Sequence, residues 1–343
     1  MKQLLNTLYI TTPESYLASD GEDVEVIVDK KCVGKLPLQN FSSIITFGYS
    51  GASPSLMQKC LEKGIQISFM APNGRLKGRV VGKPTGNVYL RKKQFEVSLS
   101  ESESLKIAKN FILGKVYNQR WMIERCIRDH PLSVDQVTLK KASTDLKSGL
   151  ESIRNAKTID NLRGIEGNLA TIYFSVFDNL IINQKEDFYF RNRNRRPPTD
   201  FVNTLLSFGY SLLANDCAAA LTANGLDSYV GFMHTDRPGR ESLALDLMEE
   251  LRGTMVDRFV LRLINLKMIK PKDLIQEPNG ACILRDESRN KFLSYWQKSK
   301  KNEIIHPYLK EKMQCGLIPL IQAQLLARYL REDMDEYPPF FWK

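Results

Sequence analysis

The spacing of hydrophobic residues changes along the chain, from alternation near the start to a helical period later on. Residues 7–11, 24–28 and 43–47 are rich in β-branched and aromatic side chains and tend to alternate between apolar and polar positions. A strand at 65–69 and another near 78–81, joined through the Asn73–Gly74 turn, continue the pattern. These segments predict a β-rich unit.

Turn and cap residues place the elements of this unit. Ser19-Asp20-Gly21, Gly34 and the stretch from Gly48 to Gly51 predict turns. A short helix is expected at 53–62, with Ser53 as its N-cap and Gly64 as its terminator.

Beyond residue 82 the pattern becomes helical. Pro84, Gly86 and the basic run 91–93 predict a linker, and from Ser104 onward Leu105 and Ala108 begin one apolar face. Further helices are expected at about 133–155, 159–182, 200–223, 241–266, 286–299 and 316–333. We therefore predict an α+β fold, with a small β-rich domain at 1–85, a linker at 86–94 and a larger all-α domain at 95–343.

Composition narrows the set of partners. The net charge of +10 and the pI of about 9.2 favour a polyanion such as nucleic acid or an acidic membrane surface. No apolar run approaches the roughly 20 residues that span a bilayer, and the N-terminus lacks a signal-peptide core, so a cytoplasmic location without membrane contact is expected. The six cysteines show no CxxC pair, which favours reduced thiols over a zinc cluster or a disulfide framework.

One carboxylate stands between two glycines inside a predicted helix at 161–177. Each glycine of Gly164-Ile165-Glu166-Gly167 costs roughly 1 kcal/mol relative to alanine in a helix. The pair would be explained by close approach of a ligand or another backbone to Glu166, or by tight packing of helices around a solvated carboxylate.

An imidazole and two carboxylates follow. His234 comes after an apolar run, where a histidine is more often a packing residue than a ligand. Asp246 and Glu249 are neighbours on one helix face, which could simply be exposed, and Arg252 could neutralise them or contact a phosphate. Glu166, His234 and one of these carboxylates could hold Mg²⁺ or Mn²⁺, although spacing alone does not establish such a site.

A basic segment at 188–196 mixes aromatic residues with arginine. Arginine suits bidentate contacts with phosphate, and aromatic rings can stack on unpaired bases. The alternative is a solvated loop whose aromatic residues are buried in the core. The candidate DNA-binding residues are Arg191, Arg193, Arg195, Arg196 and Arg252.

Together these segments resemble the CRISPR-associated Cas1 integrases, also described as metal-dependent DNA endonucleases. The resemblance rests on the order and separation of five motifs and extends over nearly the whole chain. They are Gly164-Ile165-Glu166-Gly167, Arg196-Pro197-Pro198-Thr199-Asp200, residues 205–210 (Leu-Leu-Ser-Phe-Gly-Tyr), Gly231-Phe232-Met233-His234 and residues 242–249. The chain looks most similar to Cas1 proteins of type I systems, with subtype I-C as the nearest.

The resemblance implies a role for each motif residue. Glu166, His234 and Glu249 would be the catalytic metal triad for Mg²⁺ or Mn²⁺; relatives often have Asp as the third ligand, so Asp246 is an alternative. The family also implies a homodimer formed through the N-terminal part, a Cas2 partner, and insertion of short DNA fragments into a CRISPR array. The reaction would be attack by a 3′-hydroxyl on a phosphodiester.

Two other functions fit the same residues. A nuclease acting on branched or single-stranded DNA would use water as the nucleophile at the same metal, and a non-catalytic DNA-binding scaffold would have an incomplete ligand set. Tyr173 and Tyr210 are candidates for stacking or positioning near the site, with buried packing as the alternative.

Overall fold

The computed structural model describes residues 6–48, 51–82 and 87–342. The chain divides into two compact units, Met1–Pro84 with Leu284–Asn302, and Thr85–Ile283 with Glu303–Lys343. The turn expected at 48–51 and the start of the expected linker lie partly outside the described residues.

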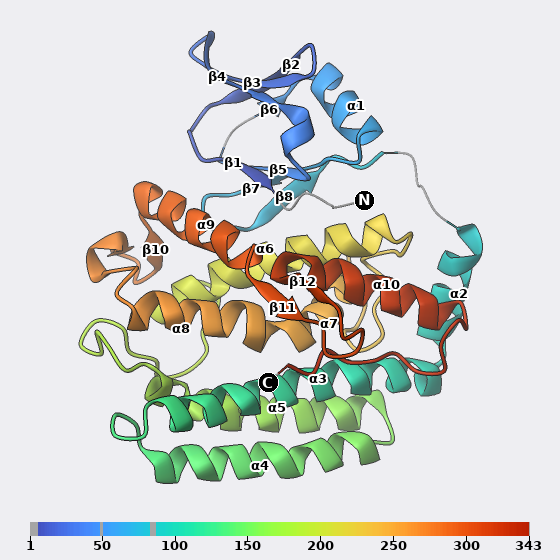
Figure 1. The fold of residues 1–343 in the computed structure, drawn as a ribbon, viewed down its shortest axis with the longest axis vertical. Coiled ribbons are helices and arrows are strands. Elements are labelled where there is room, and N and C mark those ends of the chain that lie inside the picture. Colours follow the sequence, from blue (N-terminus) through green and yellow to red (C-terminus); the bar gives the residue numbers. More distant parts are fainter. Residues whose placement is uncertain (1–5, 49–50, 83–86, 343) are drawn as a thin grey trace. The chain divides into compact units, whose positions relative to one another are not determined.

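The first unit is built on two four-stranded sheets (Figure 1). One has the order β1-β5-β7-β8, and its first three strands are parallel. The other has the order β4-β3-β2-β6. The strands are β1 (Thr7–Ile10), β2 (Tyr16–Asp20), β3 (Asp23–Val28), β4 (Lys31–Pro37), β5 (Ser43–Phe47), β6 (Gly51–Ala52), β7 (Gln66–Met70) and β8 (Leu76–Arg79), and the helices are α1 (Pro54–Glu62) and α9 (Asp286–Lys300).

The five expected strands are confirmed as β1, β3, β5, β7 and β8, whereas β2, β4 and β6 were missed. Helix α1 begins as predicted, because the Ser53 side chain accepts a hydrogen bond from Leu56 N–H at 3.2 Å. The turn predicted at Gly34 is wrong, because Gly34 lies inside β4 and pairs with Val26 of β3. Strand β4 is mostly exposed and carries no alternating pattern, so its pairing with β3 determines its conformation.

The second unit is mainly helical and confirms the predicted α+β class. Helix α2 begins at Val88, inside the stretch expected as a linker. The chain also forms two-stranded sheets, β9 (Leu274–Gln276) with β10 (Cys282–Leu284) and β11 (Glu303–Ile305) with β12 (Lys312–Gln314). The helices are α2 (Val88–Leu99), α3 (Glu101–Asp129), α4 (Gln136–Asn155), α5 (Ile159–Ser175), α6 (Phe201–Ala223), α7 (Ser242–Leu251), α8 (Arg258–Asn265) and α10 (Ile318–Leu330).

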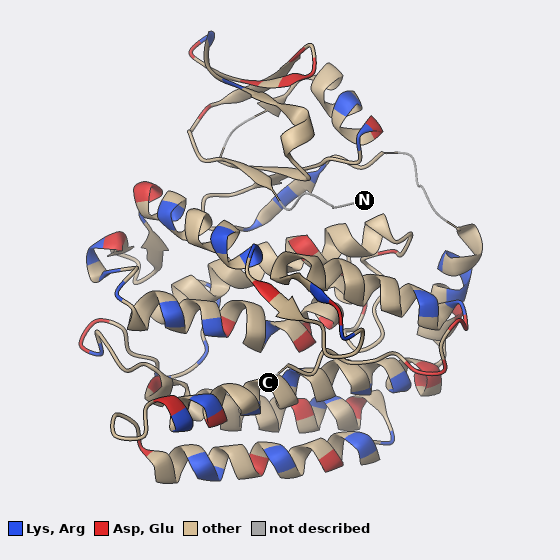
Figure 2. Ribbon diagram, viewed as in Figure 1, with Lys and Arg blue, Asp and Glu red and all other residues tan. Residues whose placement is uncertain are grey.

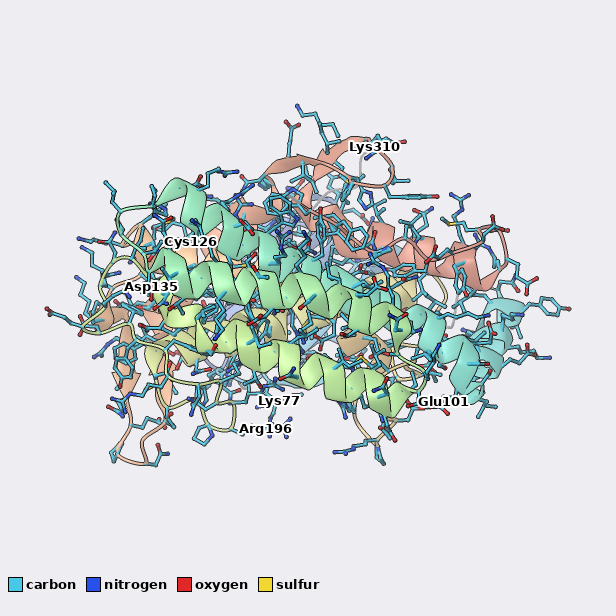
Figure 3. All side chains as sticks on the ribbon, turned by 90° about the horizontal axis from the view of Figure 1, so that it is seen from below. Lys77, Glu101, Cys126, Asp135, Arg196 and Lys310 are labelled. Carbon is cyan, nitrogen blue, oxygen red and sulfur yellow. The ribbon has the colours of Figure 1, made fainter. Side chains whose placement is uncertain are left out.

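Helices α3, α4 and α5 lie side by side in the second unit (Figure 1). Leu139, Leu146 and Ile153 of α4 are fully buried on one face. Charges of both signs lie along α4 (Figure 2), as expected for an amphipathic surface helix. Helix α3 runs from Glu101 past Cys126, and the turn into α4 lies near Asp135 (Figure 3).

A short π-helical segment, Arg252–Asp257, joins α7 to α8. The single helix predicted at 241–266 therefore has the expected extent, but an irregular middle. Segments of this kind are frequent at functional sites. Among the described residues, no helix is long and apolar enough to cross a membrane.

The packing of α3 against α7 gives a first prediction. A Cβ on Gly114 would lie 2.7 Å from Cβ of Glu250, which cannot move without its backbone. We expect Gly114→Ala to destabilise the protein by about 1–3 kcal/mol through overpacking, despite the better helix propensity of alanine. Gly164→Ala is the matched control in α5, where a Cβ meets no atom of the described structure within 4 Å. The measurement is thermal unfolding, and equal melting temperatures for the two variants would contradict the packing.

Candidate active site

The site is organised around a buried ion pair between helices. Lys115 of α3 is 3% exposed, and its ammonium contacts Oε1 of Glu166 on α5 and lies 2.9 Å from Oε2 of Glu249 on α7. The Glu249 side chain is 4% exposed and that of Glu166 is 23% exposed. Three helices thus bring two carboxylates to one cation, with Glu166 on the side nearer to solvent.

Glu249 also pairs with Arg252 of the π-helical segment, whose Nη2 lies 2.9 Å from Oε1. Burial opposes ionisation of Glu249, but the charges of Arg252 and Lys115 outweigh it and lower its pKa. Burial likewise opposes the charge of Arg252, and Glu249 with other acidic neighbours raises the Arg252 pKa. Glu249 is therefore an anion at neutral pH.

His234 is held by the carboxylate of Asp246. Its Nδ1 lies 2.5 Å from Oδ1 of Asp246, and its Nε2 lies 3.9 Å from Oε1 of Glu249. The backbone N–H groups of Phe232, Met233 and His234 also donate to Asp246, at 2.7–3.0 Å. Asp246 is 0% exposed, and each of its oxygens accepts at least two hydrogen bonds. Because Nδ1 faces a carboxylate, Nε2 is left as the free lone pair, directed toward Glu249.

The loop that carries His234 is fastened to α5. Arg163 Nε donates to Met233 O at 3.0 Å, and Arg163 Nη2 donates to Thr235 Oγ1 at 2.9 Å. Gly231 permits the close wrapping, because a Cβ there would lie 2.8 Å from Ser242 Cβ and 2.9 Å from Asp246 Oδ2. Arg163 stands one helical turn before Glu166, so the same helix positions both the carboxylate and the histidine loop.

A buried acid beneath the site anchors two tyrosines. Asp257 accepts hydrogen bonds from Tyr173 Oη, at 3.0 Å, and from Tyr210 Oη. Burial raises the pKa of Asp257 to about 6, although both hydrogen bonds act in the opposite direction. Tyr173 is fully buried in the core and contacts Asp257 through its hydroxyl, whereas the ring of Tyr210 has Arg193 and Arg252 at 5.3 and 5.2 Å from its centroid. Tyr210 therefore positions arginines beside the site.

The five candidate DNA-binding arginines separate into two groups. Arg193 turns inward, where its guanidinium donates to Asn203 Oδ1 at 2.6 Å and Ser207 Oγ at 3.0 Å, and burial lowers its pKa to about 10. Arg252 is occupied by Glu249. The exposed arginines, of which Figure 3 labels Arg196, are Arg191, Arg195 and Arg196.

The aromatic residues of the basic segment divide in the same way. Phe188 and Phe190 are buried in the core, and Tyr189 is 44% exposed with Arg191 over its ring at 5.4 Å. A surface loop with aromatic anchors, one of the two alternatives, therefore describes most of the segment.

The space beside Glu166 is open. A Cβ on either Gly164 or Gly167 would meet no atom of the described structure within 4 Å. These glycines therefore do not serve helix packing within the described part of this chain. Close approach of a ligand, the other explanation, remains consistent with their position.

The structure thus brings Glu166, His234 and Glu249 together, with Asp246 behind His234. Lys115 and Arg163 were missed from sequence. A lysine within the apolar run Phe111-Ile112-Leu113-Gly114-Lys115-Val116 could have signalled a buried ion pair, whereas Arg163 resembles any helical surface arginine.

The donor set is suited to a divalent cation. The carboxylates of Glu166 and Glu249 already converge on the positive charge of Lys115, and Nε2 of His234 faces the Glu249 carboxylate. Glu249 Oε2 is buried, and its charge is met by the Lys115 ammonium at 2.9 Å. The side chains are not closed on one point, since no group of three or more His, Cys, Asp or Glu among the described residues has metal-binding geometry. A cation would draw Glu166, His234 and Glu249 together.

The chain matches a family of CRISPR-associated proteins. The chain belongs to the Cas1 family: the model of the family described as CRISPR associated protein Cas1 matches residues 8–298. This result confirms the resemblance drawn from the motifs. A "CRISPR-associated endonuclease Cas1 2" of Rhodospirillum rubrum is 46% identical over 347 residues, covering 100% of both chains.

Solved structures share the fold. A "Casposase bound to integration product" matches with a TM-score of 0.83 at 24% identity, covering 98% of this chain and 93% of the other. A chain of a "Cas6-RT-Cas1–Cas2 complex" matches with a TM-score of 0.80 at 23% identity, covering 98% of this chain and 36% of the other.

The raised pKa of Asp257 gives a pH prediction. The folded protein holds this proton up to about pH 6, whereas an unfolded chain releases it near the ordinary pKa of 3.8, so stability falls as pH rises through that window. The loss is on the order of 3 kcal/mol. Relative to wild type, Asp257→Asn should therefore gain stability between pH 4 and pH 7, measured by urea unfolding. A constant difference between the two proteins across this range would contradict the prediction.

Proposed function

We propose that this Cas1 protein is a divalent-metal-dependent DNA integrase of CRISPR adaptation. The observation that carries the proposal is the convergence of Glu166 and Glu249 on one cation, with the free nitrogen of His234 directed at Glu249. Mg²⁺ or Mn²⁺ bound there would supply the Lewis acid for attack of a 3′-hydroxyl on a phosphodiester.

The protein's own residues supply position and charge. Asp246 fixes the ring of His234 with Nε2 toward Glu249, so this nitrogen would be available to an ion held there. Because the carboxylate of Asp246 is already taken up by N–H groups, we assign it to orienting the histidine and Glu249 to the metal. Arg252 keeps Glu249 ionised, and its guanidinium could also contact a phosphate brought to the ion.

The exposed arginines supply contacts that do not read sequence. Arg191, Arg195 and Arg196 lie on one loop that leads into α6, and phosphate contacts of this kind suit a protein that accepts fragments of any sequence. A net charge of +10 supports the same role.

The proposed partners follow the family. The fragment and the CRISPR repeat are DNA, a Cas2 protein joins the assembly, and two copies of this chain pair through the β-rich unit. An alignment with a chain from a complex that contains Cas1 and Cas2 supports this choice at the level of the fold. We place the protein in the cytoplasm, where the DNA is.

The test of function is strand transfer. A labelled DNA fragment with a free 3′-hydroxyl is mixed with a supercoiled CRISPR plasmid, Mn²⁺ and this protein, with and without Cas2. We expect label to be joined covalently to the plasmid. Nicking without transfer of label would favour a nuclease that uses water, the activity named for the endonuclease relative. DNA binding without either reaction would favour a scaffold.

The site is tested in the same assay by His234→Ala. Loss of the imidazole should reduce strand transfer by at least about 100-fold while DNA binding stays within about twofold, because the residue acts on the ion rather than on the DNA backbone. His130→Ala is the matched control, an exposed histidine after the last turn of α3. Full transfer by the His234 variant would remove this residue from the site.

The assignment of Asp246 and Glu249 is tested by thermal unfolding with and without Mn²⁺. Glu249→Gln should lose the rise in melting temperature that the ion causes, because a ligand is gone. Asp246→Asn should lower the melting temperature without metal, because an amide group would meet N–H donors, yet retain a rise when Mn²⁺ is added. The opposite pattern would make Asp246 the ligand.

A further inference from the structure

Lys115 occupies the place between the carboxylates that a metal ion would need. Its ammonium contacts Glu166 and lies 2.9 Å from Glu249, and at 3% exposure it is shielded from water. Lys115 itself is not a member of the proposed metal triad of Glu166, His234 and Glu249. A buried ammonium between two carboxylates resembles a bound metal ion in its positive charge and in part of its contact geometry. It carries one charge, whereas a divalent ion carries two.

Lys115 and a divalent metal ion cannot both lie between the carboxylates of Glu166 and Glu249. With Lys115 and Arg252 in place, two positive charges already face Glu166 and Glu249, so a divalent ion would add repulsion within a poorly hydrated site. Like charges at contact distance repel strongly where water is scarce, and a dication doubles the repulsion that a unit charge would cause. Arg252 is held by its place over Tyr210, whereas the stem of Lys115 has four flexible carbons.

We propose that Lys115 is a built-in competitor of the metal: it bridges Glu166 and Glu249 when no ion is bound and withdraws toward solvent on the Glu166 side when one binds. The inference rests on the proposed metal site. Glu166 is the more exposed of the two carboxylates, and the glycines on either side of it leave open space there. The bridge keeps the two carboxylates together in the free protein. Because metal binds only molecules without the bridge, the apparent affinity for metal falls as the fraction of molecules in the bridged state rises.

The first experiment measures Mn²⁺ affinity without DNA, by electron paramagnetic resonance of the free ion. Lys115→Gln should bind Mn²⁺ on the order of tenfold more tightly than wild type, because the competing ammonium is gone. In EDTA the variant should melt at a lower temperature, because the carboxylates then repel each other. Lys106→Gln is the matched control, an exposed lysine of the same helix that pairs with Glu103, and its affinity should equal that of wild type.

A second measurement uses the wild-type protein and does not depend on the folding of a variant. An amine-reactive reagent is applied with and without saturating Mg²⁺, and labelling at each lysine is read by mass spectrometry. The amine of Lys115 should be protected without metal and become reactive with it, while Lys106 reacts equally in both conditions. Equal protection of Lys115 in both conditions would overturn the proposal.

The outcomes separate this inference from the proposed function. Weaker or unchanged Mn²⁺ binding by Lys115→Gln, while wild type binds the ion and Glu249→Gln does not, would overturn the competition and leave the metal site intact. Absence of Mn²⁺ binding by wild type and Lys115→Gln alike, together with strand transfer that proceeds in EDTA, would overturn both.

Discussion

The structure depends on keeping two carboxylates close together in a place that water barely reaches. Like charges at such a distance repel, and their separate hydration is lost, so the fold must deliver compensating cations to the same point. Lys115 comes from α3 and Arg252 from the end of α7, each approaching Glu249 from a different side. Because of this electrostatic requirement, α3, α5 and α7 must pack closely around the same point. Gly114 contributes to this packing, because it lets α3 approach Glu250.

A second group of contacts turns a loop into a rigid part of the site. The loop at 231–235 has no regular secondary structure, yet Asp246 binds its N–H groups and Arg163 binds a carbonyl oxygen and a hydroxyl within it. The loop is thus held to α7 by an acid and to α5 by a base. Because these helices also carry Glu249 and Glu166, the ring of His234 is fixed relative to both carboxylates.

Local patterns predicted five strands of the β-rich unit and most of the helices, and the family resemblance implied the metal ligands. Neither predicted the contacts that organise them. Alternation identified β3 and β5, whereas β4 has an exposed, glycine-containing sequence that becomes a strand only by pairing with β3. The motif around Glu166 and the spacing of Asp246 and Glu249 drew attention to the site. Which of these two acids orients His234 depends on the conformation of the loop at 231–235. Lys115 is 51 residues away from Glu166 along the chain. Sequence periodicity carries no information on such distant pairings.

The π-helical segment gives the site a constraint of length as well as of composition. Arg252 and Asp257 are its first and last residues, and they contact Glu249 at one end and Tyr173 at the other. Removing one residue between them would shift the phase of α8 by about 100° about its axis. The apolar face of α8, with Val260 and Ile264 fully buried, would then turn out of the core together with Asp257. A deletion within this segment would therefore break the core and the site in a single step.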